Sequence, residues 1–265
     1  METMSDFAPI SSTSTSVSSR FKAAGIHFAI SLLIAIGITM LMLTIWYPPP
    51  YLEAIGGDQL LVLIIGVDVA LGPLLTLIVF DVKKKSLKID LAIIAFVQLL
   101  ALCYGVYSMF EGRPVYTVFV KDKFEIVTAN EIEDGELVKV TRPEFKSLPV
   151  TGPVVVAAIE PTEAKELSFV ETAAGFGMGL QNLPQYYQSY DKFRAKVLSQ
   201  AKSMAFFQKN NPAEFQRIGD ALKRTKKLAD EVVFISCIGK SKNLTVLLDR
   251  RSGEIIEFLS VVPPT

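Results

Sequence analysis

The chain has 265 residues, half of them apolar, and its mean hydropathy of +0.38 is high for a soluble protein. Lys and Arg together number 27, as do Asp and Glu, and this balance excludes a broadly basic nucleic-acid-binding protein. The first 110 residues contain long uncharged blocks, whereas the remainder carries most of the charge. We therefore predict a membrane part followed by a folded soluble part.

The first apolar segment spans residues 23–47 and follows the basic residues Arg20 and Lys22. A cleavable signal peptide would have a shorter apolar core and a small-residue cleavage site. This segment ends instead in Trp-Tyr-Pro-Pro-Pro. We therefore predict an uncleaved membrane helix, preceded by a Ser- and Thr-rich cytoplasmic tail, residues 1–22, that is disordered.

Three side chains of this segment are candidates for the membrane surface. Trp46 and Tyr47 are typical of the aromatic belt at the boundary between bilayer and water. His27, at the start of the segment, has two interpretations: an amphipathic anchor at the interface, or a partner for an acidic group inside the membrane. The anchor is favoured because side chains with polar tips commonly settle at that depth.

The second apolar segment, residues 60–80, contains one residue that does not belong in hydrocarbon, Asp68. A carboxylate near the middle of a membrane costs about 2.5–3.5 kcal/mol, so it needs a partner, a proton or a wet cavity. Gly66 and Gly72 permit the close approach of another helix, and Pro73 removes a backbone donor. These four residues are the candidate contact site for another membrane helix.

Asp68 has two interpretations that the sequence leaves open. In one, it serves helix packing within this chain, with Gln98, Ser31 or Thr39 as its partner. In the other, it contacts a helix of another protein, because an ionisable residue inside a membrane is a functional candidate by default.

A third apolar segment, residues 91–110, and the loops between the segments define the topology. The loop of residues 48–59 contains acidic residues and no basic one. Before the third segment stand four lysines: Lys83, Lys84, Lys85 and Lys88. Since basic loops stay in the cytoplasm, the N-terminus and these lysines are predicted to be cytoplasmic. The chain beyond residue 110 is then periplasmic in a bacterium with two membranes.

The three segments make residues 23–110 the transmembrane region, and residues 111–265 have the size of one domain. Apolar residues alternate on both sides of the turn at Lys121, which predicts a β-hairpin. A short apolar run at residues 154–159 predicts a strand. Three further alternating runs near the C-terminus predict a meander of antiparallel strands.

Helices are expected between these strands. Residues 162–174 have helical composition, and residues 185–209 show an amphipathic helical period. A further helix is predicted to begin after Asn211, because Asn caps helices and Pro212 fits the first turn. The periplasmic part is therefore an α+β domain, in which we expect an antiparallel sheet with helices on one face.

The sequence predicts no catalytic, cofactor-binding or metal site, and we expect no enzymatic activity. The single histidine, His27, lies in a membrane segment, so the folded part cannot build a Ser–His–Asp or Cys–His arrangement. Cys103 and Cys237 fall in different parts of the chain and form neither a disulfide framework nor a zinc pattern. The glycines at residues 175–179 lack the strand and helix that flank a phosphate-binding loop.

Several motifs follow one another in order between residues 20 and 132. They are RFKAAGIHFAISLLIA, WYPPPYLEAIGG, GVDVALGPLLTLIVF, KKKSLKIDLAIIAFVQLLALCYGVY and RPVYTVFVKDKFEIVTANEI. Together they resemble the TfpX/TfpZ family of type IV pilin accessory proteins. The later segments TGP and PQYY are compatible with that family.

The resemblance implies a protein of the bacterial inner membrane that acts as a chaperone-like accessory to a cognate type IV pilin and is not an enzyme. A pilin waits in that membrane as a single apolar helix with its globular head in the periplasm. The implied partners are therefore the major pilin subunit and the lipid bilayer, with no nucleic acid and no cofactor. The alternative is a membrane-anchored sensor whose periplasmic domain binds a small ligand. The short cytoplasmic segments, which offer no output domain, argue against the sensor.

Overall fold

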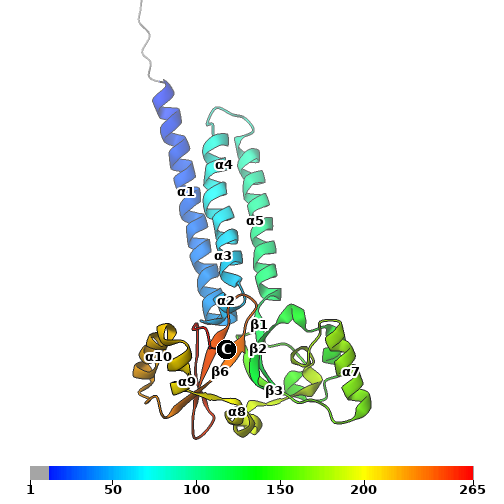
Figure 1. The fold of residues 1–265 in the computed structure, drawn as a ribbon. Coiled ribbons are helices and arrows are strands. Elements are labelled where there is room, and N and C mark those ends of the chain that lie inside the picture. The colour runs from blue at the N-terminus through cyan, green and yellow to red at the C-terminus, as the bar shows by residue number, and fades with distance from the viewer. Residues whose placement is uncertain (1–11, 265) are drawn as a thin grey trace, which may run out of the picture. The chain divides into compact units, whose positions relative to one another are not determined.

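The computed structural model of the protein describes residues 12–264. They divide into two compact units. The three-helix unit comprises the described residues up to Met40 together with Gln59–Tyr107, and the sheet domain comprises Leu41–Asp58 and Ser108–Thr265. The predicted class, three membrane-length helices and an α+β domain, is confirmed (Figure 1).

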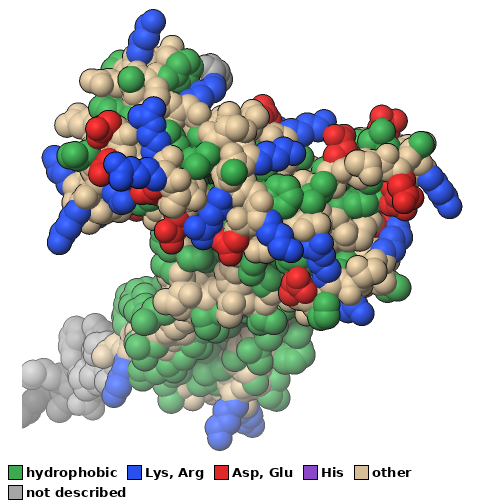
Figure 2. All heavy atoms as spheres, turned by 90° about the horizontal axis from the view of Figure 1, so that it is seen from below, with side chains coloured by type: hydrophobic (Ala, Val, Ile, Leu, Met, Phe, Trp, Pro, Cys, Tyr) green, Lys and Arg blue, Asp and Glu red, His purple; other side chains and the backbone are tan. Residues whose placement is uncertain are grey.

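Three helices are long and apolar enough to cross a membrane: Val17–Trp46, Gly57–Val79 and Leu87–Glu111. The first combines α1 (Ser12–Leu41) with a π-helical turn, η1 (Met42–Trp46). The second combines α3 (Gly57–Gly66), a π-helical turn, η2 (Val67–Leu71), and α4 (Gly72–Val79). The third is α5 (Leu87–Glu111). In Figure 2, hydrophobic side chains cover the three-helix unit, whereas charged side chains of both signs are spread over the sheet domain.

Helix α1 begins before the predicted start of the first membrane segment. Residues 12–22, which we expected to be disordered, are helical. The remainder of the predicted tail lies outside the described residues. Ser and Thr are only moderate helix formers, but no proline or glycine interrupts the chain between Ser12 and Ala24, so the apolar helix can extend toward the N-terminus.

An eight-stranded sheet organises the sheet domain, with the strand order β4-β3-β1-β2-β6-β7-β8 and with β5 paired to β6. The strands are β1 (Pro114–Val120), β2 (Lys123–Thr128), β3 (Val154–Ala158), β4 (Tyr187–Ser189), β5 (Lys202–Ser203), β6 (Val232–Ile238), β7 (Leu244–Asp249) and β8 (Ile255–Leu259). The predicted hairpin is β1–β2 and the predicted meander is β6–β7–β8, and both are confirmed.

The helices of the sheet domain are short. They are α2 (Tyr51–Ala54), α6 (Asp134–Val138), α7 (Ala164–Gly175), α8 (Arg194–Gln200), α9 (Met204–Asn210) and α10 (Pro212–Thr225), with 3-10 turns at η3 (Ala129–Glu131), η4 (Pro143–Phe145), η5 (Leu180–Asn182), η6 (Pro184–Tyr186) and η7 (Tyr190–Phe193). The cap predicted for α10 is confirmed, because the Asn211 side chain accepts a hydrogen bond from the Glu214 amide.

The sheet is mixed, which corrects the expectation of a purely antiparallel one. Strand β1 runs parallel to β3, and β2 runs parallel to β6. Each of these pairs is separated in sequence by a long connection, which leaves room for a crossover. The turn signals in the sequence mark only antiparallel pairs that tight turns join, so they give no sign of these two parallel pairs.

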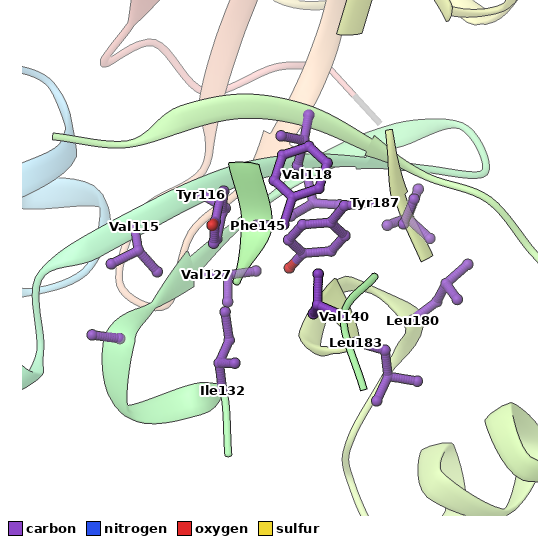
Figure 3. Close-up of a cluster of buried hydrophobic side chains, with 14 of the residues drawn as sticks. Val115, Tyr116, Val118, Val127, Ile132, Val140, Phe145, Leu180, Leu183 and Tyr187 are labelled. Carbon is purple, nitrogen blue, oxygen red and sulfur yellow. The ribbon is translucent and has the colours of Figure 1, made fainter. Parts of the chain in front are cut away.

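Helices also cover both faces of the sheet rather than one. The reason lies in β1, where every residue is buried. Its Tyr116 packs into a core with α7 and the η5–η6 segment, shown in Figure 3, while Phe119 points into a second core that includes Val197 of α8. A third core joins α9 and α10 to β6 and β7 through Phe207 and Ile218, among others. A strand buried on both sides needs cover on both sides.

The single helix predicted for residues 185–209 is wrong. The structure places β4, η7, α8, β5 and α9 within or across that range. Strand β4 pairs with β3, and β5 pairs with β6, through Lys202 opposite Phe234. Hydrogen bonds to existing strands and burial of Tyr187 and Tyr190 override the helical period of the sequence, since tertiary context outweighs local propensity.

The loop expected between the first two membrane segments belongs to the sheet domain. Tyr51 of α2 is buried in the same core as Phe124, and its hydroxyl accepts a hydrogen bond from Thr117 of β1 at 3.0 Å. The carbonyl of Ala54 accepts from the amides of Ser241 and Lys242, in the turn that joins β6 to β7, at 2.8 and 3.2 Å. The loop is thus an integral part of the domain core.

Candidate functional site

The backbone around Asp68 departs from a regular α-helix. Asp68 lies in the π-helical turn η2, and Pro73 occupies the first turn of α4 that follows. Proline has no amide hydrogen to donate, so the regular hydrogen-bond ladder cannot pass through it. Single π-helical turns occur frequently at functional sites. The turn places Asp68 toward the interior of the three-helix unit, where its exposed fraction is 8 %.

Polar side chains from all three helices meet near Asp68. The Gln98 side chain of α5 donates from Nε2 to the Asp68 backbone carbonyl at 3.3 Å. His27 Nδ1 of α1 and Thr76 Oγ1 of α4 form a hydrogen bond at 2.6 Å, and Ser31 of α1 is also buried. These contacts tie the helices together with hydrogen bonds, as expected where a hydrophobic driving force between helices is absent.

Two acceptor atoms in this cluster have no partner in the described part of the chain. They are Asp68 Oδ1 and Gln98 Oε1, and both are shielded from solvent. A buried acceptor without a donor costs about 1–3 kcal/mol. The described contacts therefore leave the cluster incomplete.

A cavity of about 280 Å³ adjoins these atoms. It is lined by His27, Ile30, Ser31 and Ile34 of α1, by Asp68 of η2, and by Ala95, Gln98, Leu99 and Leu102 of α5. Its polar lining is the cluster around Asp68, and its remaining lining is apolar. The cavity lies between α1 and α5, on the side of the unit where these two helices flank η2.

The four residues predicted to contact another helix do not share one face. Asp68 and Gly72 are buried inside the unit, whereas Gly66 is exposed and Pro73 is half-buried. A Cβ at Gly72 would lie 2.1 Å from Gln98 Nε2, while a Cβ at Gly66 would have no neighbour within 4 Å. Gly72 therefore permits the close approach of α5 within the chain.

Two of the three residues suggested as packing partners of Asp68 within the chain lie at the same site. Gln98 contacts Asp68 and Ser31 lines the same cavity, whereas Thr39 donates to the carbonyl of Ala35 in its own helix. Thr76 was missed. A lone Thr in an apolar run gives no sequence signal, and only the arrangement of the helices brings it to His27. Since Asp68 Oδ1 remains open, internal packing does not use the whole side chain.

The three predicted interface residues have different surroundings. His27 forms a hydrogen bond with the Thr76 hydroxyl and lines the same cavity as Asp68. Trp46 packs edge-to-face on Phe110, with ring centroids 5.2 Å apart. Tyr47 has an exposed fraction of 1 %, and its hydroxyl donates to the carbonyl of Met109. The Tyr47 ring is therefore enclosed by the sheet domain.

The basic residues that define the topology gather at one end of the three-helix unit. The lysines Lys83, Lys84, Lys85 and Lys88 are exposed in and just after the connection from α4 to α5. Arg20, near the start of α1, contacts Asp81 of the same connection at 3.5 Å. The first basic pair and the lysine group therefore lie on the same side of the unit, as the sequence predicts.

Neither a metal centre nor a disulfide is found within residues 12–264. No group of three or more His, Cys, Asp or Glu side chains in this range could hold a metal ion. Cys103 and Cys237 are both free thiols, and burial raises the pKa of the Cys237 thiol. The polar cluster around Asp68 is the candidate site, and the contacts within it are hydrogen bonds.

These features define a membrane protein with three spans, a polar cluster inside the spans and an α+β domain. Comparisons with known proteins identify the group. A profile of the fimbrial assembly protein FimB matches residues 15–56. Two fimbrial assembly proteins of Dichelobacter nodosus, of serogroups E1 and I, are each 33 % identical over 233 residues, which cover 86 % of this chain and 90 % of theirs.

The chain belongs to the fimbrial assembly protein family. A further relative from Dichelobacter nodosus, the fimbrial assembly protein of serogroups C1 and C2, is 42 % identical over 118 residues, 44 % of this chain and 90 % of its own. The resemblance to type IV pilin accessory proteins is thereby confirmed. No solved structure matches the chain.

Proposed function

We propose that this protein is an inner-membrane accessory factor that stabilises a cognate type IV pilin or aids its assembly into pili. The observation that carries the proposal is the similarity to fimbrial assembly proteins along 86 % of the chain. The polar cluster inside apolar helices supports it, because a factor that holds a membrane-embedded client needs affinity within the bilayer. This role requires no catalysis.

The proposed orientation rests on the positions of the basic residues. Arg20 and the lysines Lys83–Lys88 lie at the same end of the three-helix unit, and basic ends remain in the cytoplasm. The sheet domain is then periplasmic. In a Cys103→Ser background, a membrane-impermeant maleimide should label Asp122→Cys in cells with a permeabilised outer membrane. Lys84→Cys should be labelled only after lysis, and the reverse pattern would contradict the orientation.

Two contacts with the pilin are proposed. The membrane helices hold the apolar helix of the pilin, and the sheet domain touches its globular head. Such a division matches the two parts of the chain: apolar side chains cover one, and mixed charges cover the other (Figure 2). A rim of mixed charges is typical of a reversible protein contact.

The test is the dependence of the pilin on this protein. Cells that lack it should contain less of the cognate pilin and carry fewer surface pili, and wild-type protein supplied from a plasmid should restore both. Immunoblotting of membranes measures the first and electron microscopy the second. Unchanged pilin and unchanged piliation in the deletion would overturn the proposal.

A further inference from the structure

The cavity beside Asp68 is bordered by two helix faces with the same spacing. On α1 the lining residues are 27, 30, 31 and 34, and on α5 they are 95, 98, 99 and 102. Each set follows the i, i+3, i+4, i+7 pattern of one face of an α-helix. Each face extends over about two turns, or about 10 Å. These two faces border the cavity as the walls of a groove, and a face of this kind can pack against a further helix.

The lateral walls of this groove are open. Ile30 and Ile34 of α1 and Leu99 of α5 are exposed although they line it. Only 6 % of the residues in the most apolar stretch of α5 are buried, so this helix has few contacts with the rest of the unit. Within the described residues, nothing covers these side chains.

The polar atoms that line the groove indicate which hydrogen-bonding groups a bound helix needs. Asp68 Oδ1 and Gln98 Oε1 are both acceptors, both buried, and both without a partner in the described chain. Asp68 is the central residue of the span Gly57–Val79. An occupant that satisfies these atoms must therefore carry a hydrogen-bond donor at mid-membrane depth. A lipid acyl chain fits the apolar walls but has no donor.

We propose that this groove between α1 and α5 receives the membrane helix of the cognate pilin, with a hydrogen-bond donor of that helix directed at Asp68. This inference rests on the proposed function and names the surface through which it works. It also excludes the exposed face at Gly66, on the same helix as Asp68, as the contact. Gly72 acts indirectly, by letting Gln98 approach Asp68.

Disulfide crosslinking in membranes tests the location. Leu99 and Val97 are both 57 % exposed on α5, but Leu99 lines the groove and Val97 does not. Their side chains point about 160° apart around the helix. In a Cys103→Ser background, each is replaced by Cys, and single cysteines are placed along the membrane helix of the pilin. Copper phenanthroline serves as the oxidant in cells that produce both proteins.

Leu99→Cys should form a disulfide with the pilin at positions one helical turn apart, and Val97→Cys should form none, because the bond requires Cα atoms within about 7 Å. A disulfide through Val97→Cys instead, or one that joins two copies of this chain through Leu99→Cys, would overturn the proposal. If neither variant forms a disulfide with the pilin, in cells whose pilin level still depends on this protein, the groove is not the binding site for the pilin helix, but the accessory function stands. Pilin levels independent of the protein would overturn the function itself.

A second set of variants tests the donor. Asp68→Asn keeps an acceptor oxygen and Asp68→Leu removes it, so the leucine variant should give about threefold to tenfold less crosslinked product through Leu99→Cys. Asp68→Asn should give nearly the wild-type amount. The amount of each variant in the membrane, measured by immunoblotting, normalises the yields. Equal yields for Asp68→Leu and wild type would overturn the requirement for a donor.

Discussion

In the sheet domain, the buried side chains of Thr117 and Tyr51 are partners for each other, whereas in the three-helix unit two neighbouring acceptor atoms, Asp68 Oδ1 and Gln98 Oε1, have no partner among the described residues. Three of the five unpartnered buried polar side-chain atoms in the described residues lie in the smaller, three-helix unit. The sheet domain is closed by three apolar cores. Apolar packing thus specifies the sheet domain, whereas the three-helix unit keeps unused hydrogen-bonding capacity at one place, the pair Asp68 and Gln98.

The largest effect expected from this difference is on stability. Phe207 is fully buried in the core between α9, α10 and the sheet, and Phe207→Ala should lower the free energy of unfolding by about 4 kcal/mol because it leaves a cavity. Leu63 of α3 is 62 % exposed, so Leu63→Ala should cost far less. Denaturation of the detergent-solubilised protein, followed by the fluorescence of its single tryptophan, Trp46, provides the measurement. Similar losses of unfolding free energy in both variants would contradict the conclusion that apolar packing stabilises mainly the sheet domain.

A smaller effect is expected where the helices of the three-helix unit do pack closely. A Cβ at Gly105 of α5 would lie 2.7 Å from Cγ1 of Ile64, so Gly105→Leu should destabilise the unit by about 2 kcal/mol through overpacking. Gly66→Leu is the matched control, since no atom lies within 4 Å of its Cβ position. Thermal denaturation in detergent distinguishes the two variants. If Gly66→Leu is the more damaging, the inside and outside of the unit are assigned wrongly.

The smallest effect depends on pH and belongs to the sheet domain. Lys227 and the amides of Ser252 and Arg251 donate to Asp249 and hold the pKa of its carboxyl well below the usual value of 3.8. A lowered pKa in the folded state stabilises the fold above the ordinary pKa, and this contribution is lost as the pH falls through the lowered value. Asp249→Asn should therefore cost about 1 kcal/mol at pH 6.

The difference between wild type and Asp249→Asn should shrink as the pH falls below about 4, because Asp249 of the unfolded wild-type chain is then protonated while the folded state keeps the carboxylate, so that folding must release a proton. Denaturation curves at pH 6 and pH 3 measure it. Arg251→Gln serves as the control, since it leaves the Arg251 amide in place. If the difference in unfolding free energy between wild type and Asp249→Asn widens toward low pH, the pKa of Asp249 is not lowered in the folded state.

The elements predicted correctly are those whose sequence signals are local. The turn at Lys121, the Asn211 cap and the alternating runs of the meander each specify their structure within a few residues. The range 185–209 failed because its outcome depends on distant strands: β3 and β6 offer hydrogen bonds that convert parts of a helical pattern into β4 and β5. Such competition is not visible in the segment itself.

The sequence predicted the central residue of the candidate site, Asp68, and two of its neighbours, Gln98 and Ser31, but not the shape of the site. Asp68 is conspicuous because an acidic side chain in an apolar run is costly. The groove beside it was not predictable, since it depends on which faces of α1 and α5 converge on η2. The partnership of His27 with Thr76 depends on the same arrangement. The spacing of residues along one helix predicts which side chains share a face. Which faces of two helices lie against each other can be seen only in the folded structure.

The hydrogen bonds of Ala54 to Ser241 and Lys242 have a consequence for biosynthesis. The segment around Ala54 leaves the ribosome early. It can join the sheet domain only after the second and third helices have been made and inserted into the membrane, and after more than a hundred further residues have been synthesised. Completion of the domain therefore reports that the second and third helices are correctly inserted. Only molecules whose threading through the membrane is complete therefore carry a finished sheet domain.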